Sequence, residues 1–216
     1  MRLVIPYRYR MGGVELRYAI RSIYKHFKNL SGVLLIGDAP EWYKITADNH
    51  IPLADLKGEK EKSMQLKVLQ CPDAVFLYSN DDYYALEDFD YQVPHYYDTT
   101  CRDMATRHPI KSYREMYYNC QPDWLNFDVH TPMIMEKQRF INTFNAMDGQ
   151  TPIKTTYAQG LPGWYLADCK IAGEHNLKEL EYRTKDRPFF STHDSAVNPD
   201  LLEFLQKLYP DASPCE

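Results

Sequence analysis

Phe76-Leu77-Tyr78-Ser79-Asn80-Asp81-Asp82 is an apolar run that ends abruptly in two adjacent carboxylates. Ligands of open α/β sheets bind at the carboxyl ends of the strands, which is where this acidic pair is expected to lie. Neighbouring carboxylates repel each other unless a cation or a proton relieves them. Mg²⁺ and Mn²⁺ prefer oxygen ligands and keep positions for substrate phosphates. We therefore expect Asp81 and Asp82 to hold Mn²⁺ or Mg²⁺, with Asn80 beside the ligand. A surface turn is the alternative, because Asn and Asp are common turn residues.

The segments before this run predict a strand, a helix and a second strand. Arg2–Ile5 is a short apolar run that Pro6 is expected to end, because proline cannot donate to a sheet ladder. Apolar residues then recur at helical spacing from Leu16 to Phe27. Val33–Ile36 is continuously apolar, as is typical of a buried parallel strand. These elements form a βαβ unit, whose crossover is nearly always right-handed.

The alternation of helices and apolar strands continues and predicts an open α/β sheet. A third short strand is expected at His50–Leu53, a helix at Glu59–Cys71, and the strand Ala74–Tyr78 before the acidic pair. Periodicity is weak from residue 89 to 128, which suits a lid or binding segment. The remaining expectations are an irregular or helical excursion at Thr99–Tyr118, a helix at Glu136–Asn145, a strand at Phe189–Thr192 and a final helix from Pro199 to Tyr209 with Asn198 as its N-cap.

The length and composition favour one domain and argue against nucleic acid as a partner. The 216 residues are 44% apolar, so we expect a single domain over 1–216, with a nucleotide-binding half at 1–88 and an acceptor-side half at 89–216. Eighteen tyrosines suit sugar-binding clefts, although tyrosines also line half-buried strands. The net charge of −5 argues against nucleic acid as a partner.

The cysteines and the hydropathy pattern point to a reducing compartment. The five cysteines are scattered without a CxxC pair, which favours free thiols over a zinc site or a disulfide framework. The sequence shows neither a signal peptide nor a run long enough to cross a bilayer, so we expect a cytoplasmic protein.

Several residues at predicted strand ends and helix faces are candidates for binding a nucleotide. Tyr7, Arg8 and Arg10 follow the first strand, where the aromatic ring could stack on a base and the two guanidinium groups could pair with phosphate. Asp38 ends the second strand, where a carboxylate can bind a ribose hydroxyl. Arg21 and Lys62 are further candidates for the phosphates. The alternative for the charged residues among them is a solvated surface position.

Two histidines and an aspartate are candidates for the chemistry. His130 precedes a predicted helix and could act as a general base, although a lone histidine is more often structural. His193 and Asp194 follow the late strand, as a further metal ligand and a base respectively. The alternative for the second pair is a turn whose side chains bond their own backbone.

With these residues in hand, the chain resembles nucleotide-sugar transferases of the GT-A type, in which a Rossmann-like sheet binds the nucleotide and an acidic motif after a strand holds Mn²⁺ or Mg²⁺. Residues 80–82 are similar to that motif. Residues 15–23, 40–42, 76–82 and 130–132 also resemble conserved regions of the Stealth family of sugar-phosphate transferases. The first strand differs, because it carries Pro6-Tyr7-Arg8 in place of the Trp-Val-Asp-Gly type of motif found in Stealth proteins.

The resemblance implies a GT-A-like domain that transfers a sugar from a nucleotide-sugar, with a UDP-sugar as first candidate, to a hydroxyl of a glycan acceptor. Polysaccharide biosynthesis is the expected setting. Transfer of a sugar 1-phosphate is the alternative on the same fold. A carbohydrate-binding protein built on a degenerate transferase fold is a third hypothesis. A metal-dependent phosphatase or nuclease is disfavoured, because no further carboxylates cluster in the sequence.

Overall fold

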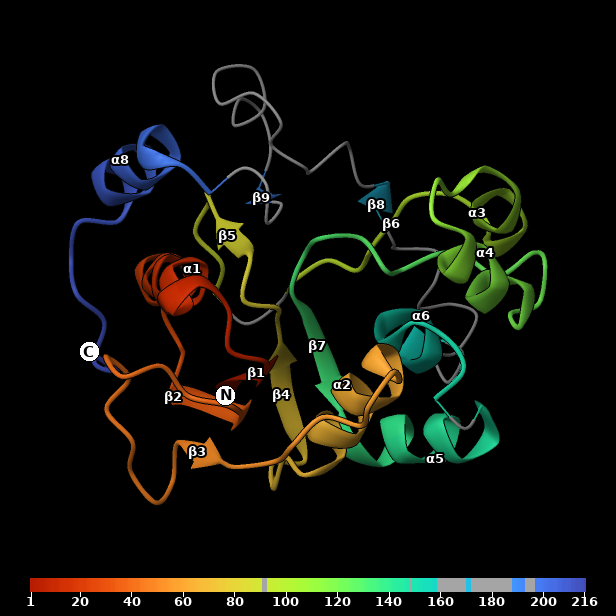
Figure 1. The fold of residues 1–216 in the computed structure, drawn as a ribbon, viewed down its shortest axis with the longest axis horizontal. Helices are drawn as coiled ribbons and strands as arrows, with labels where there is room; N and C mark the ends of the chain where they lie inside the picture. The colour runs from red at the N-terminus through yellow and green to blue at the C-terminus, as the bar shows by residue number, and fades with distance from the viewer. Residues whose placement is uncertain (91–92, 148, 159–169, 172–187, 193–196) are drawn as a thin grey trace.

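The computed structural model describes residues 1–216 except 91–92, 148, 159–169, 172–187 and 193–196. Its central sheet has the order β3-β2-β1-β4-β7 in the described residues (Figure 1). The first four of these strands run parallel and β7 is antiparallel to β4. The mostly parallel α/β sheet predicted from the sequence is therefore confirmed. The strands are β1 (Arg2–Tyr7), β2 (Gly32–Gly37), β3 (His50–Ile51), β4 (Val75–Tyr78) and β7 (Met133–Glu136).

The two faces of the sheet bury alternate residues of β1. Leu3, Ile5 and Tyr7 pack in one core cluster with apolar residues of α1 (Val14–His26). Val4 packs in another cluster with residues of three further helices. These are α2 (Lys60–Leu69), α5 (Lys137–Met147) and α6 (Ile153–Ala158). Figure 1 shows α1 and α2 on opposite sides of the sheet. The period of two along the strand thus produces helices on both faces.

The prediction that Pro6 ends the first strand is wrong. β1 continues to Tyr7, and Pro6 is paired in register with Ile36 of β2. The carbonyl of Tyr7 accepts a hydrogen bond from the Asp38 amide on the β2 side, so the neighbouring Pro6 faces the other side. The last residue of β1 paired with β4 is Val4, so the missing N–H of Pro6 has no ladder to interrupt.

The second half of the chain adds two small sheets and several helices. β5 (Tyr83–Ala85) pairs antiparallel with β9 (Phe189–Ser191), which confirms the late strand. β6 (Tyr96–Tyr97) pairs with β8 (Lys170–Ile171). The predicted excursion contains α3 (Cys101–Arg107) and α4 (Lys111–Tyr118).

The last helix begins as its sequence predicts. α8 (Pro199–Leu208) has Asn198 as its N-cap, and the Asn198 side chain accepts a hydrogen bond of 2.9 Å from the Leu201 amide. The strand β7 was missed, because Met133–Glu136 is a short run directly before the predicted helix at 136–145. The division into halves at residue 88 remains a prediction.

Four cysteines, Cys71, Cys101, Cys120 and Cys215, are buried free thiols, and Cys169 lies outside the described residues. Among the helices that the structure describes, none is both long enough and apolar enough to cross a bilayer.

The connections of the sheet create one crevice at its carboxyl edge. The chain passes from β1 to β2 and β3 on one side and then returns to place β4 on the other side of β1. At such a switch point, the connections from two neighbouring strands lead in opposite directions, and a crevice remains between them. The carboxyl ends of β1 and β4 are therefore the expected location of a ligand.

Candidate functional site at the ends of β1 and β4

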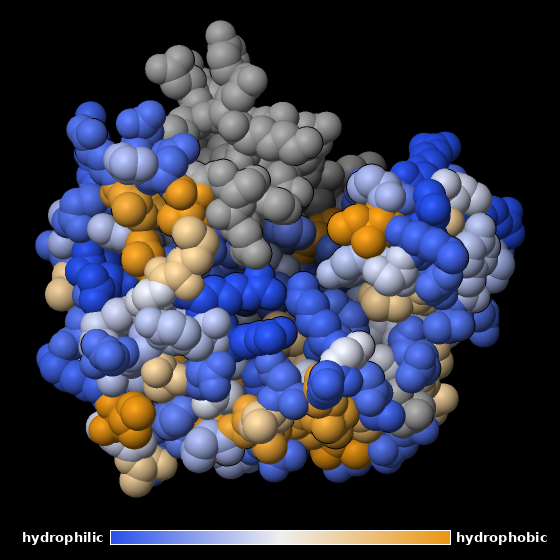
Figure 2. All heavy atoms as spheres, in the orientation of Figure 1, coloured by the Kyte–Doolittle hydropathy of each residue, from blue (hydrophilic) through white to orange (hydrophobic). Residues whose placement is uncertain are grey.

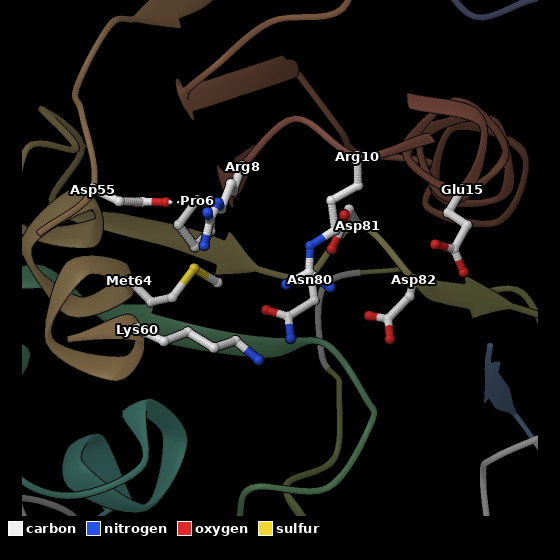
Figure 3. Close-up of a pocket in the computed structure, with 10 residues that line it drawn as sticks. All are labelled: Pro6, Arg8, Arg10, Glu15, Asp55, Lys60, Met64, Asn80, Asp81 and Asp82. Atoms are coloured by element: carbon white, nitrogen blue, oxygen red, sulfur yellow. Dashed lines mark ion pairs between the residues drawn. The ribbon is translucent and has the colours of Figure 1, made fainter. Parts of the chain in front are cut away.

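A pocket of about 100 Å³ lies at this switch point. Residues after β1, the start of α1, the segment around α2 and the turn after β4 contribute to it (Figure 3). Figure 2 shows hydrophilic side chains gathered in the middle of the molecular face where these strands end in Figure 1. The pocket is lined by Pro6, Arg8, Arg10, Glu15, Asp55, Lys60, Met64, Asn80, Asp81 and Asp82.

Three carboxylates line one end of the pocket. Figure 3 shows Asp81 and Asp82 on the turn after β4, with Glu15 of α1 beyond them. Glu15 is buried and accepts a hydrogen bond from the hydroxyl of Thr192. Burial raises the pKa of Asp82 well above its ordinary value, and the charges of Asp81 and Glu15 raise it further. This end of the pocket is thus poised to accept positive charge.

Three cations line the same pocket. Arg8 and Arg10 follow β1, and Lys60 begins α2. Figure 3 shows the Lys60 side chain extending toward Asn80. Guanidinium and ammonium groups are the usual partners of phosphate oxygens. Carboxylates for a metal ion and cations for phosphates therefore share one cavity.

Tyrosines hold the acidic turn in place. The hydroxyl of Tyr78 donates a 2.5 Å hydrogen bond to Asn80 Oδ1, and Asn80 Nδ2 donates a 2.9 Å bond to the hydroxyl of Tyr83. The Ser79 amide also donates to the Val4 carbonyl, which ties the turn to β1. The position of Asn80 is fixed from both sides, so the neighbouring carboxylates start from a rigid turn.

The donor atoms of this site fit a hard divalent cation. Asp81 and Asp82 offer carboxylate oxygens, and Asn80 offers an amide oxygen. Mg²⁺ is usually held by one or two carboxylates together with substrate phosphates. Over the residues that the structure describes, no group of three His, Cys, Asp or Glu side chains is arranged to hold a metal ion. A metal held by the two aspartates would therefore take its other ligands from substrate or water.

The structure brings five predicted residues into the pocket, namely Arg8, Arg10, Asn80, Asp81 and Asp82. The buried ring of Tyr7 contradicts the predicted stacking on a base. It is 1% exposed, and its hydroxyl accepts a 3.2 Å hydrogen bond from the Arg10 amide. Burial raises the pKa of Tyr7 to about 12. Tyr7 thus supports the loop that carries Arg10.

Three predicted nucleotide contacts are not among the described residues that line the pocket. Asp38 is exposed, and its Oδ2 accepts a 2.8 Å hydrogen bond from the Tyr9 amide. Arg21 forms a bidentate pair with Glu216 at 2.6 and 2.7 Å. Lys62 of α2 has its Nζ 4.0 Å from Glu59 Oε2, and its stem approaches the position of Gly149. A strand end or a helix face did not specify which way these side chains point.

The predicted catalytic residues are placed only in part. His130 Nδ1 lies 2.7 Å from the hydroxyl of Ser191, and its ring is tilted against that of Tyr83 with centroids 5.4 Å apart. His130 is thus near the acidic turn, and its role as a base remains a prediction. His193 and Asp194 lie outside the described residues.

The sequence did not point to Glu15, Asp55 or Lys60 as site residues. Glu15 is in the first turn of α1, where its charge also suits the helix dipole, so its sequence position alone does not indicate a site. Arg10 was predicted as a phosphate contact from the Tyr-Arg-Tyr-Arg run that it shares with Arg8, and it lines the pocket. Asp55 is in an irregular segment and carries no pattern, so only the three-dimensional structure could assign it.

A buried ionisable cluster adjoins the pocket behind Tyr83. Lys154 of α6 is fully buried and donates a 3.1 Å hydrogen bond to the Thr131 carbonyl. Burial lowers the pKa of Lys154 to about 8, while the charges of Asp128 and Asp82 oppose this fall. Burial also raises the pKa of Asp128, against the charges of Lys154 and Lys60. Positive and negative groups are therefore interleaved from the pocket into the core.

Fold and site define an α/β protein with an acidic and basic pocket at the switch point of its sheet. The chain is similar to the solved structure of galactosyltransferase LgtC in complex with donor and acceptor sugar analogs. The two share 10% sequence identity with a TM-score of 0.45, over 99% of this chain and 98% of that chain. An active-site mutant of LgtC gives 11% identity and a TM-score of 0.46, over 100% and 98%. No protein-family model matches the chain, and no curated protein matches it. Likeness at this level carries no conclusion about the reaction.

Proposed function

We propose that this protein is a metal-dependent glycosyltransferase, which moves a sugar from a nucleotide-sugar donor to a hydroxyl of a saccharide acceptor. A UDP-sugar is the first candidate for the donor. The observation that carries this proposal is the joint lining of one switch-point pocket by Asp81 and Asp82 and by Arg8, Arg10 and Lys60. A nucleoside diphosphate with a divalent cation has the matching charges.

The groups of the pocket have distinct roles in this proposal. Asp81 and Asp82 would hold Mn²⁺ or Mg²⁺, which when bound stabilises negative charge on the departing diphosphate. The phosphate oxygens are bound by Arg8, Arg10 and Lys60. These contacts orient the donor toward the acceptor.

The transfer itself needs a base near the acceptor. The acceptor oxygen attacks the anomeric carbon, the bond from that carbon to the diphosphate breaks, and the nucleoside diphosphate leaves with the electron pair. The proton of the acceptor hydroxyl passes to a base, for which His130 and Asp194 are our candidates.

Calorimetric titration of UDP, with and without Mn²⁺, tests the proposal. Wild type should bind UDP more tightly with Mn²⁺ than without it. In Asp81→Ala, the affinity for UDP in the presence of Mn²⁺ should fall tenfold or more. Asp123→Ala is the matched control, because Asp123 is 90% exposed beside Arg102 and outside the described pocket lining. A folded wild type that binds neither UDP, GDP nor ADP in the presence of Mn²⁺ would overturn the proposal.

Transfer of a sugar 1-phosphate is a second candidate, favoured by the three cations that line the pocket. The products separate the two reactions, because glycosyl transfer from a UDP-sugar releases UDP and sugar-phosphate transfer releases UMP. A non-catalytic carbohydrate-binding protein is the third candidate. It predicts that Asp81→Ala binds saccharides as wild type does and that neither nucleotide is released.

A further inference from the structure

Asp55 lies at the opposite end of the pocket from Asp82 and Glu15. Figure 3 shows Arg8 and Pro6 beside Asp55, with Arg10 and Asp81 farther along the pocket. The Asp55 side chain is 25% exposed, and its Oδ2 lies 3.6 Å from Arg8 Nε. The pocket is therefore polarised, with one carboxylate at the β3 side and a group of three at the β5 side.

A buried lysine fixes the position of Asp55. Lys67 of α2 is 1% exposed, and its Nζ lies 2.5 Å from Asp55 Oδ1. The same ammonium donates a 2.7 Å hydrogen bond to the Tyr7 carbonyl at the end of β1. A buried ammonium needs such acceptors, and together they tie the Asp55 segment to the sheet edge.

The last residue of β2 leaves room for this arrangement. Gly37 has φ of +124°, and a Cβ there would lie 2.0 Å from the Tyr7 carbonyl oxygen and 2.8 Å from Lys67 Nζ. Any side chain at this position would displace the carbonyl and the ammonium that hold Asp55. Three separate segments of the chain are thus built around one carboxylate in the pocket.

The charges around Asp55 set what it can bind. It lies between Lys67 and Arg8, so it lacks the excess negative charge found at Asp81 and Asp82. A carboxylate neutralised in this way is a poor second metal site, but its oxygens still accept hydrogen bonds from hydroxyl groups. A pair of neighbouring hydroxyls matches the two oxygens of one carboxylate.

We propose that Asp55 recognises the ribose hydroxyls of the nucleotide in this pocket and that Lys67 positions its carboxylate. This inference rests on the proposed function. The nucleoside then lies at the β3 side, the phosphates lie beside Arg8 and Arg10, and the diphosphate end reaches Asp81. The protein selects ribonucleotides over nucleotides that lack the ribose hydroxyls.

The test compares UDP with 2′,3′-dideoxy-UDP by calorimetry in the presence of Mn²⁺, with GDP and ADP and their dideoxy forms alongside. Wild type should bind the ribonucleotide about tenfold more tightly, as expected for a hydrogen bond to a charged group. Asp55→Asn should bring this ratio close to one and leave the affinity for inorganic pyrophosphate within about twofold, because pyrophosphate lacks the ribose.

The variants separate recognition from folding. Lys67→Met should also lower the ribose preference while pyrophosphate binding persists, which a purely structural loss would not produce. Asp48→Asn is the matched control, since Asp48 is an exposed aspartate between β2 and β3. Asp38→Asn tests the rival carboxylate and should keep the wild-type ratio.

Different failures have different meanings. Equal binding of UDP and dideoxy-UDP by wild type would overturn the role of Asp55 and leave the proposed function intact. Loss of the ratio in Asp38→Asn but not in Asp55→Asn would do the same. Absence of any nucleotide binding by wild type would overturn the proposed function itself.

Discussion

The ammonium of Lys154 lies 5.0 Å from the centre of the Tyr83 ring, directly behind the acidic turn. Lys154 is fully buried, and its charge opposes those of Asp128 and Asp82. Lys154→Met should destabilise the protein by about 3 kcal/mol, because removal of one partner leaves buried negative charge uncompensated. Urea denaturation measures this loss.

The double variant Lys154→Met/Asp128→Asn should recover part of that stability, since it removes charge from both sides. Lys111→Met is the control for loss of a lysine. Lys111 is 81% exposed and pairs with Glu115 on the surface, so its substitution should change stability by less than about 1 kcal/mol. Equal stability of the two single lysine variants would contradict the role of Lys154 in compensating the buried negative charge.

The half-buried carboxyl of Glu61 should make stability fall as pH rises. Burial raises the pKa of Glu61 to about 7, and the charge of Asp128 adds to this rise, against Lys60 and Tyr113. An unfolded glutamate releases its proton near pH 4.3, so between about pH 4 and 7 the folded state binds more protons than the unfolded state. The stability that this proton confers is fully present below that range and is lost as pH rises through about 7.

Urea midpoints at pH 5 and pH 8 check this prediction. The midpoint of wild type should fall more between these values than that of Glu61→Gln. Glu115→Gln serves as the control, because Glu115 lies on the exposed side of α4 and should leave the wild-type slope unchanged. If the urea midpoint of Glu61→Gln falls between pH 5 and pH 8 as much as that of wild type, the raised pKa of Glu61 is not the cause of the pH dependence.

The bond from Tyr78 to Asn80 should contribute to ligand binding as well as stability. Tyr78→Phe removes a 2.5 Å hydrogen bond that holds the acidic turn. We expect a loss of about 1 kcal/mol in stability and a severalfold loss in the Mn²⁺-dependent affinity for UDP. Calorimetry and thermal unfolding measure the two effects.

Tyr43→Phe is a matched control for Tyr78→Phe. Its hydroxyl donates a 3.0 Å hydrogen bond to the Asn49 carbonyl, away from the acidic turn. Its stability should fall by a similar amount with no change in UDP affinity. Equal affinities for all three proteins would show that the turn keeps its geometry without Tyr78.

Gly37 should be intolerant of substitution. In Gly37→Ala the new methyl group would meet the Tyr7 carbonyl oxygen at 2.0 Å in a conformation with positive φ. We expect a destabilisation of about 3 kcal/mol or failure to fold, from overpacking added to backbone strain. Gly58→Ala shares the positive φ but meets nothing within 4 Å, so it should cost only about 1 kcal/mol. Similar costs for both variants would mean that the β1 edge relaxes around the methyl group.

The parts of the fold that follow from local pattern were predictable from the sequence. The helix Val14–His26 has clear periodicity, the strand Gly32–Gly37 contains a continuous apolar run, and Asn198 with Pro199 is a strong helix start. β7 was missed, because its identity as a strand comes from pairing with β4 and not from its own residues.

The candidate site was likewise only partly predictable from the sequence. Asp81 and Asp82 could be found because a strand ends at them, and strand ends share one edge of a sheet. Asp38 also follows a strand, yet its side chain turns to the Tyr9 amide. Asp55 takes a place in the pocket through Lys67, a contact between residues that no sequence period relates. Side-chain direction and long-range ion pairs are therefore the part that sequence reasoning did not reach.

The antiparallel pairing of β4 with β7 has a consequence for synthesis on the ribosome. β4 is made well before Met133–Glu136, and residues 79–132 must emerge between the two strands. During that interval β4 has an open edge, which is a template for association with other chains. Nascent chains that stop within residues 79–132 are thus the species most dependent on chaperones. Once β7 emerges and pairs with β4, this edge is covered.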